Sequence, residues 1–194
     1  ESVLAPLLEL ENIEVLTIDD GSSTTPNFHY THPRLYTASH SINLGQGAAL
    51  QTGFEIAKLL NPEYVVTMDA DGQHDIASLP NLIEIIKNGH ADIIFGKRDL
   101  NKSKGITKIR KITLRLGVLF NWLYTGIKLS DAHNGYRVMN RKAYRSIELK
   151  ENGMAHATEI LEEVKQHNLS YAEAEVNISY SEYSKAKGQH NLNA

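Results

Sequence analysis

Short apolar runs rich in β-branched residues alternate with amphipathic stretches along this chain, and this alternation constrains the fold more than any other feature. The runs predict strands, and the stretches, in which apolar residues recur every three or four positions, predict helices. We expect strands at 13–18, 34–38, 64–68 and 92–95, with helices at 46–60 and 77–87. Strands that alternate with helices form a mostly parallel sheet covered on both faces. The sequence therefore predicts an α/β fold with three layers, α/β/α.

The remaining elements are expected mostly in the second half of the chain. Residues 2–10 resemble the end of a helix, and further helices are expected at 106–124, 141–147 and 157–167. A last strand is expected at 171–180, where apolar and polar residues alternate. Because the sequence has no internal repeat, low-complexity segment or Pro/Gly-rich linker, we expect one domain over residues 1–194.

The composition excludes several classes of protein. The chain has 194 residues, of which 41% are hydrophobic and 22% charged, as in an ordinary soluble globular domain. Its longest uncharged apolar run, 116–127, is too short to cross a bilayer. The absence of cysteine excludes disulfides, thiolate metal sites and a cysteine nucleophile, and it fits a reducing compartment. We therefore expect a cytoplasmic location.

The charges are distributed unevenly. The net charge is −3, yet eight of the 20 Lys and Arg residues fall between Lys97 and Arg115, where Asp99 is the one acid. This basic strip lies on an otherwise acidic chain, and it favours a phosphate-bearing partner. Aromatic residues do not interleave the strip and the net charge is negative, so no nucleic-acid partner is expected.

Two acidic loops follow predicted strands, at the edge where open parallel sheets bind their ligands. One holds Asp19 and Asp20, and the other holds Asp69, Asp71 and Gln73. The latter three are spaced two residues apart, so they point the same way if the backbone stays extended. Their oxygens suit Mg²⁺ or Mn²⁺, which leave other positions to water and substrate phosphates. One such loop alone is usually a solvated turn, but two together favour a metal site that takes a diphosphate.

Several segments resemble family-2 glycosyltransferases of the GT-A fold. They are 19–22 (DDGS), 43–49 (NLGQGAA) and 69–74 (DADGQH), in this order. A later segment, 131–139 (DAHNGYRVM), is similar to the acceptor-side segment of the polyprenyl-phosphate branch, the dolichyl-phosphate mannose or glucose synthase-like enzymes. The resemblance covers nearly the whole chain from Ile13. It implies a Rossmann-like nucleotide-sugar-binding half over 1–90 and an acceptor-side half over 91–194.

The resemblance also implies roles for individual residues. Asp19 and Asp20 would contact the nucleotide of a sugar-nucleotide donor, while Asp69 and Asp71 would hold the cation on its diphosphate, with Gln73 as a further ligand. The other residues expected near substrates are Asn43, Gly45 and Gly47 beside the nucleotide, Arg98, Asp131 and Arg137 on the acceptor side, and Lys185 and Lys187 in a loop that closes over the active site. Asp71, Asp131 and Arg98 are the predicted catalytic residues.

The sequence departs from the family pattern at two places. Relatives often carry Lys or Arg where this chain has Gln46, so one donor contact differs. The family also opens with a strand and a Pro-x-Tyr-Asn-Glu-like loop, which residues 1–12 do not match. We expect this opening to lie outside the sequence.

The basic strip has helical spacing. Lys104, Lys108, Lys111 and Arg115 align in one stripe of the predicted helix 106–124 and the turn before it, beside an apolar stripe. Many such helices simply bury one face and solvate the other. A cationic stripe beside an apolar one is also typical of a helix that lies on an anionic membrane, and the family resemblance favours that reading. We therefore expect a peripheral protein at the cytoplasmic face of the membrane.

The acceptor decides the chemistry. A lipid phosphate is already anionic at pH 7 and needs cations to guide it, whereas a sugar hydroxyl needs a general base. The sequence therefore favours metal-assisted, inverting transfer of a hexose from a nucleotide-diphosphate sugar to polyprenyl phosphate. The alternative is transfer to a saccharide hydroxyl in cell-surface polysaccharide synthesis, with Asp131, or less favourably Glu159, as the base.

Other classes of function fit less well. A dinucleotide-binding dehydrogenase would use Gly45 and Gly47 as its phosphate turn, but Leu50 replaces the third small residue. A haloacid-dehalogenase-type phosphatase would need Thr where Gln73 stands. A non-catalytic nucleotide-sugar-binding protein is a further alternative, since a fold can persist without turnover; intact Asp69 and Asp71 argue against it.

The interfacial helix gives a first testable prediction. Replacing Lys108 and Lys111 with Glu should weaken binding to anionic vesicles, because each cation near such a surface contributes about 1 kcal/mol. Affinity for the soluble donor should change less. Vesicle co-sedimentation beside donor titration measures both, and unchanged vesicle binding would show that this helix does not meet the membrane.

Overall fold

The computed structural model describes residues 3–23, 31–89, 91–98, 118, 122–131 and 134–177. The chain divides into two compact units, each made of two segments. Unit 1 holds residues 1–65 and 140–169, and unit 2 holds residues 66–139 and 170–194. The predicted single domain and its halves at 1–90 and 91–194 stay predictions, and each unit is described by itself.

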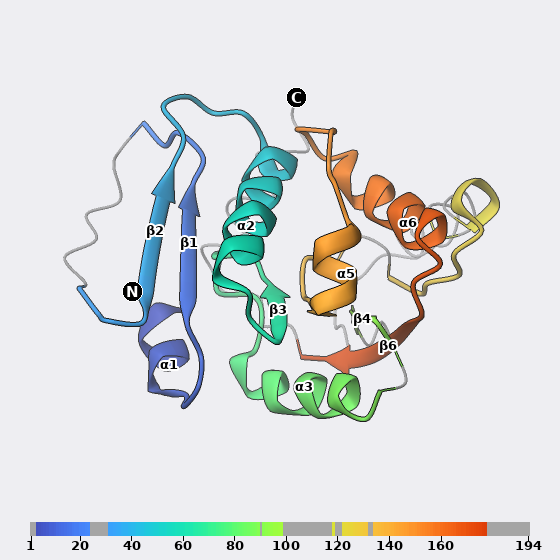
Figure 1. Cartoon of the computed structure of the whole chain (residues 1–194), viewed down its shortest axis with the longest axis horizontal. Helices are drawn as coiled ribbons and strands as arrows, with labels where there is room; N and C mark the ends of the chain where they lie inside the picture. The colour runs from blue at the N-terminus through green and yellow to red at the C-terminus, as the bar shows by residue number, and fades with distance from the viewer. Residues whose placement is uncertain are drawn as a thin grey trace, which may run out of the picture. The chain divides into compact units, whose positions relative to one another are not determined.

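Unit 1 opens with a short helix and two parallel strands. Helix α1 (Leu4–Glu9) precedes β1 (Val15–Asp19), which pairs with β2 (Leu35–Ser39) in continuous register from Val15 opposite Leu35 to Asp19 opposite Ser39. Figure 1 shows the two strands side by side and pointing the same way. Both strands end at the same edge of the two-stranded sheet, so Asp19 and the residues after Ser39 lie at that edge.

Three further helices complete unit 1. Helix α2 (Gln46–Leu60) has the bounds that the sequence predicts, and it ends at Asn61 in the left-handed conformation. Helix α5 (Arg141–Ser146) begins at Asn140, whose side chain accepts a hydrogen bond from the Ala143 N–H and so caps the helix. Helix α6 (His156–Gln166) buries apolar residues at helical spacing: Ala157, Ile160, Leu161 and Val164.

Unit 2 is built on a four-stranded sheet with the order β3-β5-β4-β6. Its strands are β3 (Tyr64–Thr67), β4 (Ile93–Arg98), β5 (Arg137–Asn140) and β6 (Tyr171–Val176). Strands β3 and β5 each cross the boundary of the unit. Strand β4 runs parallel to β6 and antiparallel to β5. A 3-10 turn, η1 (Ile76–Ser78), leads into helix α3 (Leu79–Lys87), which buries Leu79, Leu82 and Ile86. The strand β4 that carries Arg98 is thus central and fixed on both sides.

Most predicted elements are confirmed within a few residues, and so is the α/β class with mainly parallel pairing. Strand β5 is absent from the predictions. It has only four residues and starts with Arg137, so its sequence shows neither a long apolar run nor clean alternation. The structure nevertheless buries Arg137, Val138 and Met139 in the sheet.

Two predicted features lie largely or wholly outside the described residues. They are the helix 106–124, of which 118 and 122–124 are described and helical, and the loop that carries Lys185 and Lys187. None of the helices in the described ranges has the length and hydrophobicity needed to span a bilayer.

Candidate active site

The loop after β3 carries the three predicted metal ligands, and it turns sharply. Gly72 has a φ of 75°, and the backbone N–H of Gln73 donates to the Asp71 carboxylate over 3.0 Å. The extended backbone assumed in the sequence analysis is therefore wrong here. A tight turn of this kind needs glycine because other side chains disfavour positive φ. The structure brings Asp71 and Gln73 together through the turn rather than through alternation.

Asp69 is held from two sides within unit 2. His74 Nε2 lies 3.2 Å from Asp69 Oδ2, and a methyl group on Gly135 would come within 2.6 Å of the same oxygen. The Thr67 hydroxyl also donates to the Gly135 carbonyl over 2.9 Å, which ties the end of β3 to this glycine. Only a residue without Cβ lets the backbone approach the carboxylate this closely. Gly135 therefore has a physical role that its place in a motif does not reveal.

Arg137 is the most deeply buried cation among the described residues. Its side chain is 2% exposed, and this burial lowers its pKa to about 10, while the nearby carboxylates of Asp69 and Asp131 oppose that shift. At this value the guanidinium is charged at neutral pH. An isolated buried charge is costly, so the two carboxylates stabilise it electrostatically. The predicted direct contact of Arg137 with substrate stays a prediction, and its burial favours an electrostatic role.

Asp131 and Arg98 form a two-pronged ion pair in unit 2. Arg98 donates from Nε and Nη2 to the two carboxylate oxygens over 2.6 and 2.9 Å, and its backbone N–H donates over 3.2 Å. Two-pronged contacts of this kind fix orientation as well as distance. The Asp131 side chain is 8% exposed and that of Arg98 27% exposed. The structure thus brings together two predicted catalytic residues, with Arg98 as the more accessible one.

In unit 1, Asp20 fastens the loop that leads into α2. Its carboxylate accepts hydrogen bonds from the backbone N–H groups of Leu44 and Gly45 over 2.9 and 2.7 Å. His40 Nδ1 lies 2.7 Å from it, and His40 Nε2 lies 2.9 Å from the Thr52 hydroxyl. Although partial burial works to raise it, the pKa of Asp20 is lowered by these hydrogen bonds. Asp20 therefore shapes the loop directly, whatever it contacts in a substrate.

The other predicted nucleotide contacts also have local structural roles. Asp19 accepts hydrogen bonds from the backbone N–H and hydroxyl of Ser22. Gly45 has a φ of 109°, and the Gly47 N–H donates to the Asn152 carbonyl over 2.7 Å. A side chain on either glycine would collide with the backbone of 151–152. These close approaches account for glycine at both positions even without a bound ligand, so the nucleotide contacts of Gly45 and Gly47 stay predictions. The nucleotide contact of Asn43, which is exposed, also stays a prediction.

Two residues of this network were not predicted from the sequence. His40 and Thr52 stand 20 and 32 positions from Asp20, and no motif links the three. His74 directly follows Gln73, but its contact with Asp69 depends on the turn at Gly72.

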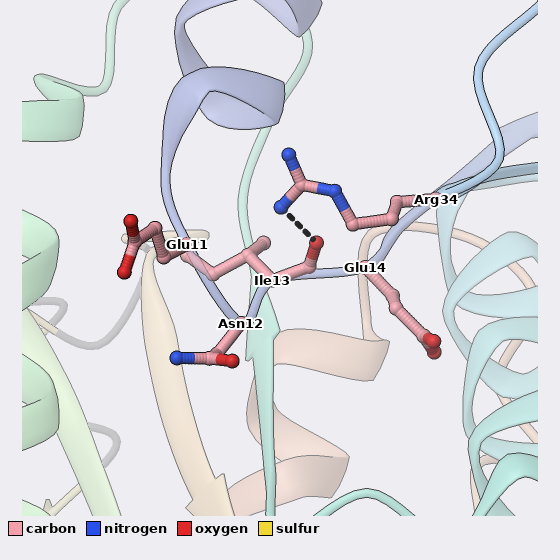
Figure 2. Close-up of a pocket in the computed structure, with 5 residues that line it drawn as sticks. All are labelled: Glu11, Asn12, Ile13, Glu14 and Arg34. Carbon is pink, nitrogen blue, oxygen red and sulfur yellow. Dashed lines mark hydrogen bonds between the residues drawn. The ribbon is translucent and has the colours of Figure 1, made fainter.

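A surface pocket of about 590 Å³ lies elsewhere in unit 1, lined by Glu11, Asn12, Ile13, Glu14 and Arg34 (Figure 2). Arg34 donates to the Ile13 carbonyl over 3.1 Å, and also to the carbonyls of Leu8 within α1 and of Leu10 directly after it. A cation at the C-terminal end of a helix stabilises its unpaired carbonyls. The pocket contains none of the predicted site residues, and its arginine serves to anchor α1.

The donor set of the β3 loop fits a divalent cation that a substrate completes. No group of three or more His, Cys, Asp or Glu residues able to hold a metal gathers in the described ranges. Mg²⁺, however, is usually bound by one or two carboxylates together with water and substrate phosphates. Asp69 and Asp71 supply that number of carboxylates, and the same loop carries Gln73.

Comparison with known proteins identifies the family. The family model for glycosyl transferase family 2 matches residues 1–148. An uncharacterized protein of Methanocaldococcus jannaschii is 28% identical over 90% of this chain and 73% of its own length. A UDP-N-acetylglucosamine–dolichyl-phosphate N-acetylglucosaminyltransferase of Methanococcus voltae is 29% identical over 80% of this chain and 63% of its own length.

Further similarities concern a second named enzyme and a solved fold. An undecaprenyl-phosphate mannosyltransferase of Micrococcus luteus is 29% identical over 70% of this chain and 58% of its own length. The crystal structure of a mycobacterial protein superposes with a TM-score of 0.64 at 15% identity, over 93% of this chain and 62% of that one. The chain thus spans less than two thirds of both named enzymes.

The chain belongs to glycosyl transferase family 2. The sequence-based identification of the family and of its enzyme class is confirmed. The expected α/β fold of the GT-A type is confirmed as well.

Gly135 gives a prediction for this site. Gly135→Ala should displace Asp69, because the new methyl group would lie 2.6 Å from its carboxylate oxygen. The fold should survive, since a partly exposed side chain can move aside. Glycosyl transfer should fall by about 100-fold, the order of loss that a misplacement of about 1 Å causes.

Gly153→Ala is the matched control, because an added methyl group there meets open space. Its transfer rate and thermal unfolding should equal those of the wild type. If Gly135→Ala transferred hexose at the wild-type rate, the close packing of Asp69 on Gly135 would have no functional importance.

Proposed function

We propose that this protein transfers a hexose from a nucleotide-diphosphate sugar to a polyprenyl phosphate, with a divalent cation and with inversion at the anomeric carbon. The named relatives support the acceptor class, since they are a dolichyl-phosphate N-acetylglucosaminyltransferase and an undecaprenyl-phosphate mannosyltransferase. The observation that carries the choice of acceptor for this chain is the pairing of Asp131 with Arg98.

Asp131 is poorly suited to act as a general base. Both of its oxygens accept hydrogen bonds from one guanidinium, at 2.6 and 2.9 Å, so taking up a proton would break a strong ionic contact. Transfer to a sugar hydroxyl requires such a base, whereas transfer to a phosphate does not. This supports the phosphate acceptor over the saccharide hydroxyl with Asp131 as base. Asp131 then acts as a positioning residue for Arg98.

Arg98 would guide the acceptor. It ends the central strand β4, it is partly exposed, and Asp131 fixes the direction of its guanidinium. A planar guanidinium is well matched to phosphate oxygens. In the reaction, an acceptor phosphate oxygen attacks the anomeric carbon while the bond to the donor diphosphate breaks, and the nucleoside diphosphate leaves with the electron pair. A single displacement of this kind inverts the configuration.

The cation would be held by Asp69 and Asp71, with Gln73 as a further ligand. When bound, it supplies positive charge to the leaving diphosphate, which is where negative charge accumulates. Neighbouring residues position the two carboxylates: Gly135 and His74 restrict Asp69, and the Gln73 N–H hydrogen-bonds to Asp71. Asp19, Asn43, Gly45 and Gly47 remain the proposed nucleotide contacts, and Lys185 and Lys187 the proposed closing loop.

A membrane-side acceptor also fits an exposed apolar surface in unit 2. Trp122, Leu123 and Tyr124 are 43%, 72% and 62% exposed, and the Lys128 ammonium lies 5.7 Å from the Trp122 ring centre. Exposed aromatic and cationic residues together are typical of proteins at a membrane–water interface. We include a peripheral location at the cytoplasmic face of the membrane in the proposal, with the basic strip as the lipid-facing segment.

Asp71→Ala tests the proposal. It should abolish transfer of radiolabelled hexose from GDP-mannose or UDP-glucose to polyprenyl phosphate in vesicles supplied with Mn²⁺, because the leaving diphosphate loses its cation. Circular dichroism should show an intact fold. Glu84→Gln, an exposed carboxylate on α3, is the control and should keep full activity.

The same assay separates the alternatives. Retained activity in Asp71→Ala would refute the metal assignment. Transfer to a saccharide but not to the lipid would establish the hydroxyl acceptor, and no turnover of either donor by the wild type, with or without Mn²⁺, would favour a non-catalytic binding protein.

A further inference from the structure

His74 is more deeply buried than the residue it contacts. Its side chain is 4% exposed, whereas that of Asp69 is 38% exposed, and the two meet through His74 Nε2 and Asp69 Oδ2 at 3.2 Å. The imidazole also lies edge-on to the Tyr136 ring, with ring centres 5.0 Å apart and an angle of 75° between the planes. Tyr136 is itself fully buried. The ring of His74 is therefore held by packing before any ligand arrives.

The hydrogen-bonding pattern defines the tautomer of His74. An ionised carboxylate only accepts hydrogen bonds, so Nε2 must carry the proton in this contact. Within the described part of the chain, Nδ1 is buried and has no hydrogen-bond partner. A bare lone pair is tolerated there more readily than an N–H, because a buried donor without an acceptor loses its hydration. The contact with Asp69 thus places a proton on Nε2.

We infer that His74 is the positioning residue of the proposed cation site, and that its Nε2–H fixes the orientation of the Asp69 carboxylate. This inference rests on the proposed function, in which Asp69 binds the cation. Gly135 restricts the carboxylate by contact alone, whereas His74 restricts it by a directional bond. A carboxylate fixed in this way pays less ordering entropy when it binds a cation, and such supporting bonds typically change metal affinity by about 10–100-fold.

Two substitutions at this position separate the bond from the packing. His74→Phe keeps an aromatic ring against Tyr136 but removes the donor. His74→Gln places an amide N–H close to the position of Nε2 and so keeps the donor. We expect the affinity for Mn²⁺, titrated calorimetrically in the presence of GDP and separately of UDP, to fall by about tenfold or more in His74→Phe. In His74→Gln it should stay within about threefold of the wild type.

His167→Gln is the control, since this partly exposed histidine lies at the end of α6, where its Nε2 is 3.4 Å from a Glu163 oxygen. Its Mn²⁺ affinity should be unchanged. A second readout does not depend on the cation: ¹⁵N NMR of the metal-free, full-length protein should show His74 with a protonated Nε2. Thermal unfolding of each variant reports whether packing is preserved.

Each outcome decides the inference. Wild-type Mn²⁺ affinity in His74→Phe, equal losses in His74→Phe and His74→Gln, or an unprotonated Nε2 would overturn it while leaving the proposed function intact. A wild-type protein that takes up no Mn²⁺ with either nucleotide would instead refute the proposed metal site, and the inference would fall with it.

Discussion

The buried guanidinium of Arg137 is the constraint on which the rest of unit 2 depends. A charge that is 2% exposed must be offset inside the protein, and the carboxylates of Asp69 and Asp131 provide the opposite charge. Each carboxylate also makes a hydrogen bond of its own: Asp69 accepts one from His74, and Asp131 accepts one from Arg98. One cation on a short central strand thus links the proposed cation site to the proposed acceptor site electrostatically.

The carboxylates of unit 1 serve a different purpose. Asp20 accepts hydrogen bonds from two backbone N–H groups of the loop before α2 and also contacts His40 Nδ1. Asp19 accepts hydrogen bonds from Ser22. Hydrogen bonds of this kind give the loops at the ends of β1 and β2 a defined shape. Acidic residues that follow a strand can therefore be needed for loop structure as well as for ligands, and a sequence motif does not distinguish the two.

The sequence predicted what depends on local periodicity and on motif order. Helix α2 was predicted to the residue because apolar side chains recur along it at helical spacing, and the family followed from three acidic and glycine-bearing segments in one order. Strand β5 was not predicted, because a buried arginine disrupts its apolar pattern. Asp131 and Arg98 are 33 positions apart in the sequence, and His40 and Asp20 are 20 positions apart. Only the folded chain brings each pair together, so no local sequence pattern predicts these contacts.

The central claim is that Asp69 and Asp71 share a divalent cation with the donor diphosphate. Anomalous diffraction from crystals of the full-length protein grown with Mn²⁺ and a nucleoside diphosphate locates the cation directly. We expect a manganese peak in contact with carboxylate oxygens of this pair and with phosphate oxygens of the nucleotide. A bound nucleotide with no manganese at these two side chains would contradict it.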